Sequence, residues 1–121
     1  MFDYSLTGLV TLLTVLVYIK TALDVGGARA RHNTPAPAMS GPEELNRYIR
    51  VQANTLETMM IFFPALWLFA LTISDIYAAA IGLLYPVSRV FYARRYQDGE
   101  NRGRAFTVGF MATNVLIAGA L

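Results

Sequence analysis

Four long stretches of this sequence contain no Asp, Glu, Lys or Arg, and they constrain the fold more than any other feature. Together they make up about half of the 121 residues: Tyr4–Ile19, Thr58–Ser74, Ile76–Ser88 and Ala105–Leu121. A compact soluble chain of this length buries too little surface to hide so many apolar side chains. Charged residues are only 15% of the chain, which argues against disorder, and the absence of cysteine excludes a disulfide-rich secreted scaffold. The sequence therefore predicts an integral membrane protein.

Each of these stretches predicts one transmembrane helix. A helix needs about 20 mainly apolar residues to cross the hydrocarbon core, and polar flanking side chains can extend a shorter stretch. The stretches are rich in Leu, Ala, Ile and Phe and do not alternate between apolar and polar residues, which argues against a β-barrel. Only Ser74-Asp75 separates the second stretch from the third, which predicts a tight helical hairpin.

We therefore expect an all-α integral membrane protein, a four-transmembrane-helix bundle that forms a single domain over residues 1–121. The first connection, Val25–Pro42, contains Gly26-Gly27 and three prolines, which predicts a non-helical loop. Its last residues, Ser40-Gly41-Pro42-Glu43-Glu44, combine a capping residue, a proline and two acidic residues, as at a helix start. The predicted helices cover roughly residues 2–23, 43–73, 76–97 and 102–120.

All ten basic residues fall in two regions, from Lys20 to Arg50 and from Arg89 to Arg104. In a chain with four crossings these regions contain the first and third connections, which lie on the same side of the membrane. Because basic loops stay in the cytoplasm, we expect loops 1 and 3 there and both termini outside. The net charge of +2 reflects this topology and does not indicate nucleic-acid binding. The short chain and the lack of a targeting segment favour a bacterial inner membrane.

A polar face is predicted on the second helix. Arg47, Arg50, Asn54 and Glu57 are spaced so that all four lie within an arc of about 80°. Glu57 begins an apolar span, and an ionisable residue at the membrane boundary is by default a functional-site hypothesis. The alternative is structural: Arg47 or Arg50 neutralises Glu57, and the set only holds helices together.

A matching face is predicted on the third helix, where Tyr85, Arg89, Tyr92 and Tyr96 recur at helical spacing. Tyrosine at a membrane boundary is often only an interfacial anchor, but an arginine among these tyrosines must find an anionic or carbonyl partner.

Further cations lie on the same side of the membrane, at Arg29, Arg102 and Arg104. Guanidinium groups bind carboxylates, a buried carboxylate can take an ammonium, and Asn54 can pair with peptide groups. This rim therefore suits a small ligand that carries several carboxylates and one amine. The sequence contains no Cys/His cluster, so no metal site is predicted.

The stretch Arg50-Val-Gln52-Ala-Asn54-Thr-Leu-Glu57 resembles the signature of the membrane-associated proteins in eicosanoid and glutathione metabolism, the MAPEG family. The resemblance extends over nearly the whole chain. It includes Ala28-Arg29 after the first helix, Arg89-x-x-Tyr92-x-x-x-Tyr96 on the third, and Asn101-Arg102-Gly103-Arg104 before the fourth. Each motif is weak alone, but their order and spacing agree together.

The resemblance implies a homotrimer in membrane lipid, with glutathione as co-substrate bound between neighbouring subunits near the cytoplasmic surface. It implies that Arg29 holds a glutathione carboxylate, that Arg50 balances charge, and that Glu57 receives the γ-glutamyl ammonium. Among the other matching positions, it implies that the peptide groups or the pocket wall are contacted by Gln52, Asn54, Arg89, Tyr92 and Tyr96.

Gln52 lies on the opposite face of its helix from Asn54. This placement is awkward for a pocket within one subunit, but it fits a site shared across a subunit interface.

The family's thiol-activating arginine lies at the start of the fourth helix, and here Arg102 and Arg104 both match. A guanidinium there would stabilise the glutathione thiolate and lower the thiol pKa. Side chains two positions apart on a helix differ in direction by about 200°, so the two arginines cannot serve the same site. Arg102 is favoured because it follows Asn101 as the family's arginine follows a polar residue; Arg104 stays the alternative.

The predicted function is that of a glutathione transferase or peroxidase, a detoxifying enzyme whose thiolate attacks a lipophilic electrophile or hydroperoxide. Phe106, Val108 and Phe110 follow the arginines where several relatives carry a hydroxyl, which argues against a specialised eicosanoid synthase. The alternative is a non-catalytic MAPEG relative that binds lipid or a partner protein. A small four-helix drug transporter fits less well, because Tyr4–Ile19 contains no carboxylate.

Overall fold

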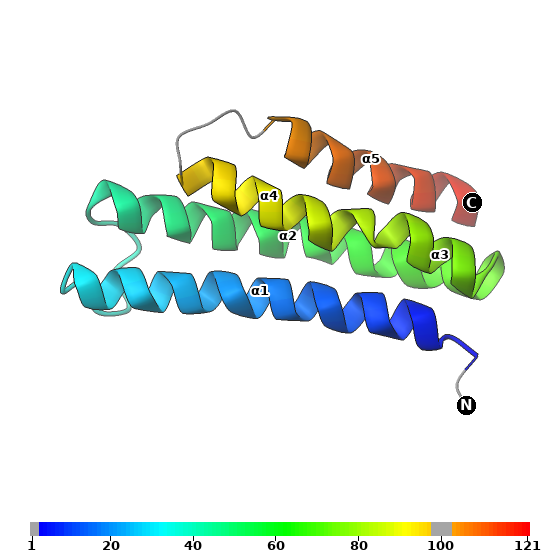
Figure 1. Cartoon of the computed structure of the whole chain (residues 1–121), viewed down its shortest axis with the longest axis horizontal. Helices are drawn as coiled ribbons and strands as arrows, with labels where there is room; N and C mark the ends of the chain where they lie inside the picture. The colour runs from blue at the N-terminus through cyan, green and yellow to red at the C-terminus, as the bar shows by residue number, and fades with distance from the viewer. Residues whose placement is uncertain (1–2, 98–102) are drawn as a thin grey trace.

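The computed structural model describes residues 3–97 and 103–121, and their architecture is an all-helical bundle (Figure 1). The helices follow the chain in the order α1 (Ser5–Arg31), α2 (Glu43–Thr72), α3 (Asp75–Gly82), α4 (Leu84–Gln97) and α5 (Gly103–Ala120). Helix α2 packs against α1 on one side and α5 on the other, and α4 packs against α5.

The hydrophobic core of the bundle is formed where these helices meet. Phe62 of α2 is completely buried, and its ring stacks on that of Tyr85 of α4 with centroids 4.2 Å apart. The core also contains Val10, Met59, Ala65, Leu66, Phe69, Ala70, Ala78 and Leu116.

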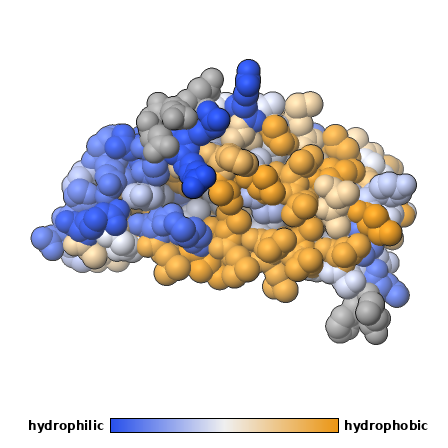
Figure 2. Space-filling model, viewed as in Figure 1, coloured by the Kyte–Doolittle hydropathy of each residue, from blue (hydrophilic) through white to orange (hydrophobic). Residues whose placement is uncertain are grey.

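Apolar side chains also cover much of the outside of the bundle. Three helical segments are long and apolar enough to cross a membrane: Ser5–Arg31, Glu43–Thr72 and Asp75–Gln97, the last containing α3 and α4. After these three segments the chain continues into helix α5, which has 18 residues. Figure 2 shows a broad apolar surface over most of the bundle and a hydrophilic surface at the end where the α1–α2 loop lies.

The two basic regions of the sequence meet at this hydrophilic end, because α1 and α4 both run toward it and α2 starts there (Figure 1). The start of α1 and the end of α5 lie at the other end of the bundle. That loops 1 and 3 share one side of the membrane, and that this side is the cytoplasm, both stay predictions.

Helix α1 is longer than the sequence predicted. It was expected to end near residue 23 and to be followed by a non-helical connection from Val25, but it continues through Gly26-Gly27 to Arg31. The reason is tertiary packing: Val25 and Ala28 are buried against Leu45 and Ile49 of α2. Burial of these side chains outweighs the cost of about 1 kcal/mol for each glycine inside a helix.

Helix α2 begins at Glu43, as predicted, but Ser40 is not its cap. The N-cap residue is Pro42 and makes no side-chain capping bond. The Asn46 side chain instead accepts a hydrogen bond from Gly41 N at 2.8 Å and donates one to Gly41 O at 2.9 Å.

The third predicted helix, 76–97, is divided at Leu83 into α3 and α4. Pro86 lacks the amide hydrogen that would bond to the carbonyl of Gly82, so the series of helical backbone hydrogen bonds is interrupted there. Ser74 caps α3 by accepting a hydrogen bond from Tyr77 N, which closes the tight hairpin after α2. The fourth helix is described from Gly103, and residue 102, its predicted start, lies outside the described residues.

The α2–α3 hairpin also fixes the start of α1. The Asp75 carboxylate accepts hydrogen bonds from Thr7 N at 2.8 Å, from the Thr7 hydroxyl at 2.7 Å and from Leu6 N at 3.3 Å. These amides belong to the first turn of α1 and have no partner within the helix. A carboxylate 68 residues away in the chain thus provides the cap that α1 lacks locally.

Candidate functional site

The polar face predicted on α2 points out of the bundle. Arg50 and Glu57 are exposed, and Asn54 between them is half-buried. Arg50 Nη1 donates to the Tyr96 hydroxyl at 3.5 Å. The structure thus confirms that these three side chains share one helix face.

Two acceptors on this face are unused within the described part of the chain. Glu57 forms no hydrogen bond or ion pair with a described residue, and the buried Oδ1 atom of Asn54 accepts no hydrogen bond. Arg47 lies 3.9 Å from Glu43, one turn earlier. The structural alternative, in which Arg47 or Arg50 neutralises Glu57, is therefore not what the described residues show.

Gln52 of α2 contacts α1, and Arg29, near the end of α1, contacts the α1–α2 loop. Gln52 Nε2 donates to the Tyr18 hydroxyl of α1 at 3.4 Å. Arg29 Nη1 donates to two carbonyl oxygens of the α1–α2 loop, Thr34 O at 3.3 Å and Ala38 O at 2.6 Å. Neither side chain forms a hydrogen bond or ion pair with the outward face that Arg50, Asn54 and Glu57 share. The predicted site residues are thus divided between two sides of the chain.

Arg89 is buried inside the bundle, with 3% of its surface exposed. Its Nη2 atom donates to the Thr55 hydroxyl at 2.8 Å, and its guanidinium lies 4.1 Å from the centre of the Tyr92 ring. A cation–π contact and one hydrogen bond replace the carboxylate that a buried arginine usually has. The buried Nε atom has no hydrogen-bond partner among the described residues, so part of the donor capacity of this cation is free.

Tyr92 and Tyr96 line the interface between α4, α2 and α5. Tyr92 is buried against Val51 and Ala105, and its ring centroid lies 5.8 Å from that of Tyr96 and 6.2 Å from that of Phe106. Tyr96 is half-buried and its hydroxyl faces Arg50, beside the outward face of α2. Tyr92 therefore packs the interior, whereas Tyr96 lies next to the candidate site.

The sequence did not reveal two threonines that connect α2 to α4. The Tyr85 hydroxyl donates to Thr55 O at 3.2 Å and forms a hydrogen bond with the Thr58 hydroxyl. Thr55 also accepts the bond from Arg89. In the sequence, each appears as a hydroxyl residue on the apolar stripe of α2. This pattern does not distinguish a contact with another helix from a hydrogen bond to the backbone of the same helix.

The two arginines proposed to activate the thiol are not distinguished by the structure. Arg102 lies outside the described residues. Arg104 is exposed in the first turn of α5. The choice between them stays open.

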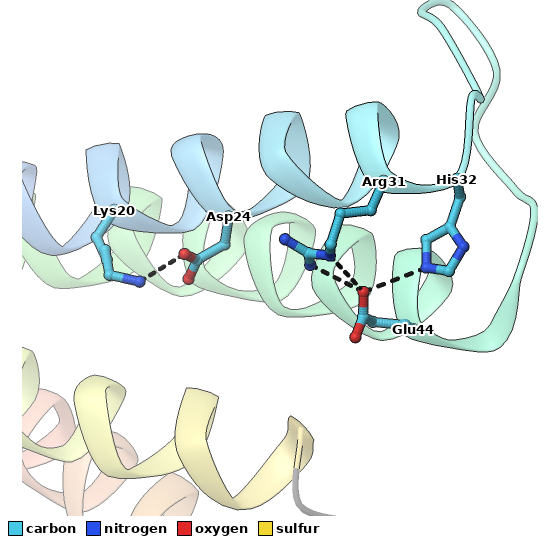
Figure 3. A network of polar contacts seen from close by, with 5 residues as sticks. All are labelled: Lys20, Asp24, Arg31, His32 and Glu44. Carbon is cyan, nitrogen blue, oxygen red and sulfur yellow. Dashed lines mark hydrogen bonds and ion pairs between the residues drawn. The ribbon is translucent and has the colours of Figure 1, made fainter.

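A polar network at the hydrophilic end links α1 to α2, outside the apolar surface of the bundle (Figure 3). Glu44 Oε1 accepts from Arg31 Nη2 at 2.8 Å and Nε at 3.0 Å, and lies 3.2 Å from His32 Nε2. The hydrogen bonds from Arg31, and then that from His32, lower the pKa of the Glu44 carboxyl. Lys20 and Asp24, one turn apart on α1, form a separate ion pair of 2.5 Å.

Comparison with known proteins adds to this geometry. The model of the MAPEG family matches residues 7–121. The chain is 39% identical over 114 residues to an uncharacterized protein, sll1147, of Synechocystis, covering 93% of this chain and 83% of that one. It is 35% identical to microsomal glutathione S-transferase 2 of mouse (83% and 68% covered) and 34% identical to leukotriene C4 synthase of guinea pig (74% and 60%).

Proposed function

We propose that this chain, which belongs to the MAPEG family, is a membrane-bound glutathione transferase with glutathione peroxidase activity. Similarity to microsomal glutathione S-transferase 2 over most of the chain supports a glutathione-related function in the membrane. The second substrate is a lipophilic electrophile or hydroperoxide that enters from the bilayer. The enzyme thereby detoxifies apolar compounds.

The observation that carries the proposal is the outward face of α2. Over about two turns of one helix, it presents the Arg50 guanidinium and two acceptors that have no partner among the described residues, the Oδ1 of Asn54 and the Glu57 carboxylate. Glutathione offers the complementary groups: carboxylates for the guanidinium, peptide N–H groups for the amide oxygen and an ammonium for the carboxylate. An unpaired carboxylate at the start of an apolar span is costly unless a ligand compensates it.

The division of the site residues supports a homotrimer with a shared site. Gln52 contacts α1, and Arg29 of α1 contacts the α1–α2 loop; neither forms a hydrogen bond or ion pair with Glu57. In a ring of identical subunits, each interface joins one side of a chain to the other side of its neighbour. The outward face of α2 would then meet Gln52 and Arg29 of the next subunit, and Arg29 would exchange its loop carbonyls for a glutathione carboxylate.

The chemistry requires the glutathione thiol as its anion. A guanidinium at the start of α5, Arg102 or Arg104, would stabilise the thiolate and lower the thiol pKa from about 8.5 toward neutral pH. The sulfur then attacks an electrophilic carbon and displaces the leaving group, which forms the thioether conjugate. With a hydroperoxide, the sulfur attacks the terminal oxygen, the O–O bond breaks, and the alcohol leaves after taking up a proton. The resulting glutathione sulfenic acid reacts with the thiol of a second glutathione, which gives the disulfide and water.

Glutathione binding to the detergent-purified protein tests the role of the α2 face. We expect Glu57→Gln to weaken binding about tenfold or more, since a hydrogen bond to a charged group contributes about 1.5–3 kcal/mol. Glu43→Gln makes the same change on the same helix, at a residue that is exposed two turns before Arg50, and should leave binding unchanged. Equal affinity of Glu57→Gln and the unchanged protein would contradict the assignment.

We propose a bacterial inner membrane as the location, with loops 1 and 3 in the cytoplasm. The clustering of basic residues at one end of the bundle supports this orientation. Glutathione is a cytoplasmic thiol, so the Arg50 end of α2 would lie where the co-substrate is available. Labelling of single cysteines introduced at Met39 and Leu121 with an impermeant reagent tests the orientation. Only the Leu121 position should react from outside.

A further inference from the structure

A groove of about 890 Å³ lies between α1 and α4, with α2 as its floor. Leu16 and Val17 line it from α1, Val87 and Val90 line it from α4, and Val51 lines it from α2. The groove is separate from the outward face of α2, since Arg50, Asn54 and Glu57 do not line it.

The polarity of the residues that line the groove changes along its length. Its lining residues on α1 run from Leu13 to Asp24. Those on the other wall run from Leu83, which precedes α4, to Gln97 at the end of α4. Both helices run toward the hydrophilic end (Figure 1). On α1 the lining residues are apolar up to Val17 and polar from Lys20, and on α4 the last two lining residues are Arg94 and Gln97. At 1.5 Å per residue, the apolar part of each wall is about 10 Å long before the first charged side chain. An amphiphile would find hydrocarbon contacts and then a polar environment along the same path.

The described residues that line the groove carry more positive than negative charge. Lys20, Arg89 and Arg94 are basic, and the carboxylate of Asp24 is paired with Lys20 at 2.5 Å. Arg94 is exposed and forms no ion pair with a described residue. Arg89 is buried, and its Nε has no hydrogen-bond partner among the described residues. The excess of positive charge on the groove lining favours an anionic occupant.

We propose that the α1–α4 groove binds an anionic phospholipid of the surrounding membrane. One acyl chain lies between Leu16 and Val87, and the phosphate lies near Arg94 and Lys20. A phospholipid is the occupant because both walls continue into exposed apolar surface, at Leu12 and Leu16 on α1 and at Val87 and Val90 on α4. Lipid is the solvent at this surface, and basic side chains at the membrane boundary attract anionic headgroups.

Native mass spectrometry of the full chain, stripped of lipid in neutral detergent, tests the proposal. The probes are phosphatidylglycerol, phosphatidylcholine with the same acyl chains, and free oleate. We expect one phosphatidylglycerol for each chain, bound about fivefold more tightly than the other two probes, because the anionic headgroup meets Arg94 and Lys20. Equal affinity for phosphatidylcholine, or tighter binding of oleate, would overturn the proposal.

Two variants and one control locate the site. Arg94→Gln should weaken phosphatidylglycerol binding about fivefold. Arg31→Gln removes a guanidinium at the same end of the bundle but outside the groove, and should leave binding unchanged. Val87→Trp fills the apolar wall and should weaken binding without changing the number of chains in the complex. Equal losses in Arg94→Gln and Arg31→Gln would overturn the proposal. A Val87→Trp protein that loses subunits but still binds the lipid would also overturn it, because the groove would then hold a second copy of the chain.

Discussion

The packing of α5 on α4 depends on Gly109, and its replacement by alanine gives a prediction whose size can be worked out. A Cβ atom at this position would lie 2.4 Å from Ser88 Oγ, and 3.5 Å from Ser88 Cβ and from Tyr85 Cδ2. Ser88 is buried, and its hydroxyl donates to Tyr85 O at 2.7 Å. The serine can therefore avoid the new methyl group only by breaking this bond or by displacing α5.

Two effects oppose each other in Gly109→Ala. Alanine stabilises a helix by about 0.8–1.0 kcal/mol relative to glycine, and an extra carbon in a packed interface costs about 1–3 kcal/mol. The free energy of unfolding should therefore fall by about 0–2 kcal/mol. In a Ser88→Ala background the Oγ atom is absent and the nearest neighbours are at ordinary contact distance. There the same change should raise the free energy of unfolding by up to about 1 kcal/mol.

Unfolding of the four proteins of this cycle, followed by circular dichroism in detergent during denaturant titration, measures the coupling. We expect Gly109→Ala and Ser88→Ala to be coupled by about 1–3 kcal/mol, with the double variant more stable than the sum of the single effects predicts. If the effects add to within about 0.5 kcal/mol, the close approach of α5 to Ser88 is not what requires glycine here.

Three further predictions use the same unfolding measurement. Phe62→Ala should lower the free energy of unfolding by about 3–5 kcal/mol, because Phe62 is fully buried, whereas Leu68→Ala at an exposed position should have a much smaller effect. Thr55→Val should cost about 1–3 kcal/mol, because the buried Arg89 loses its hydrogen-bond acceptor; an unchanged stability would contradict the importance of this contact. Lowering the pH should destabilise the hydrophilic end. The folded-state pKa of Glu44 is lowered, so its stabilising contribution is present above the ordinary carboxyl pKa and is lost as the pH falls through the lowered one. Glu44→Gln should remove this part of the pH dependence.

Local patterns predicted much of this fold. Charge-free stretches identified the helical segments, because the bilayer requires long apolar runs. Helical periodicity correctly placed Arg50, Asn54 and Glu57 on one face and Gln52 on the opposite face. The resemblance to the MAPEG family is confirmed by the match over residues 7–121.

The structural features that the sequence did not predict depend on contacts between residues that are far apart in the chain. The glycines after Val25 favour a helix end locally, but burial against α2 keeps α1 helical to Arg31. The capping of α1 by Asp75 joins residues 68 positions apart. The acceptor for Arg89 is a threonine of another helix, and no local pattern distinguishes Thr55 from the other threonines of α2.

The central claim is that this protein binds glutathione and holds it as a thiolate. Its most direct test is a titration with glutathione that follows thiolate absorbance in the ultraviolet, with Arg102→Ala and Arg104→Ala measured in parallel. We predict a saturable thiolate signal near neutral pH that is lost in one of the two variants, which identifies the activating arginine. Absence of any glutathione binding would contradict the account and would leave a MAPEG relative that binds lipid or a partner protein.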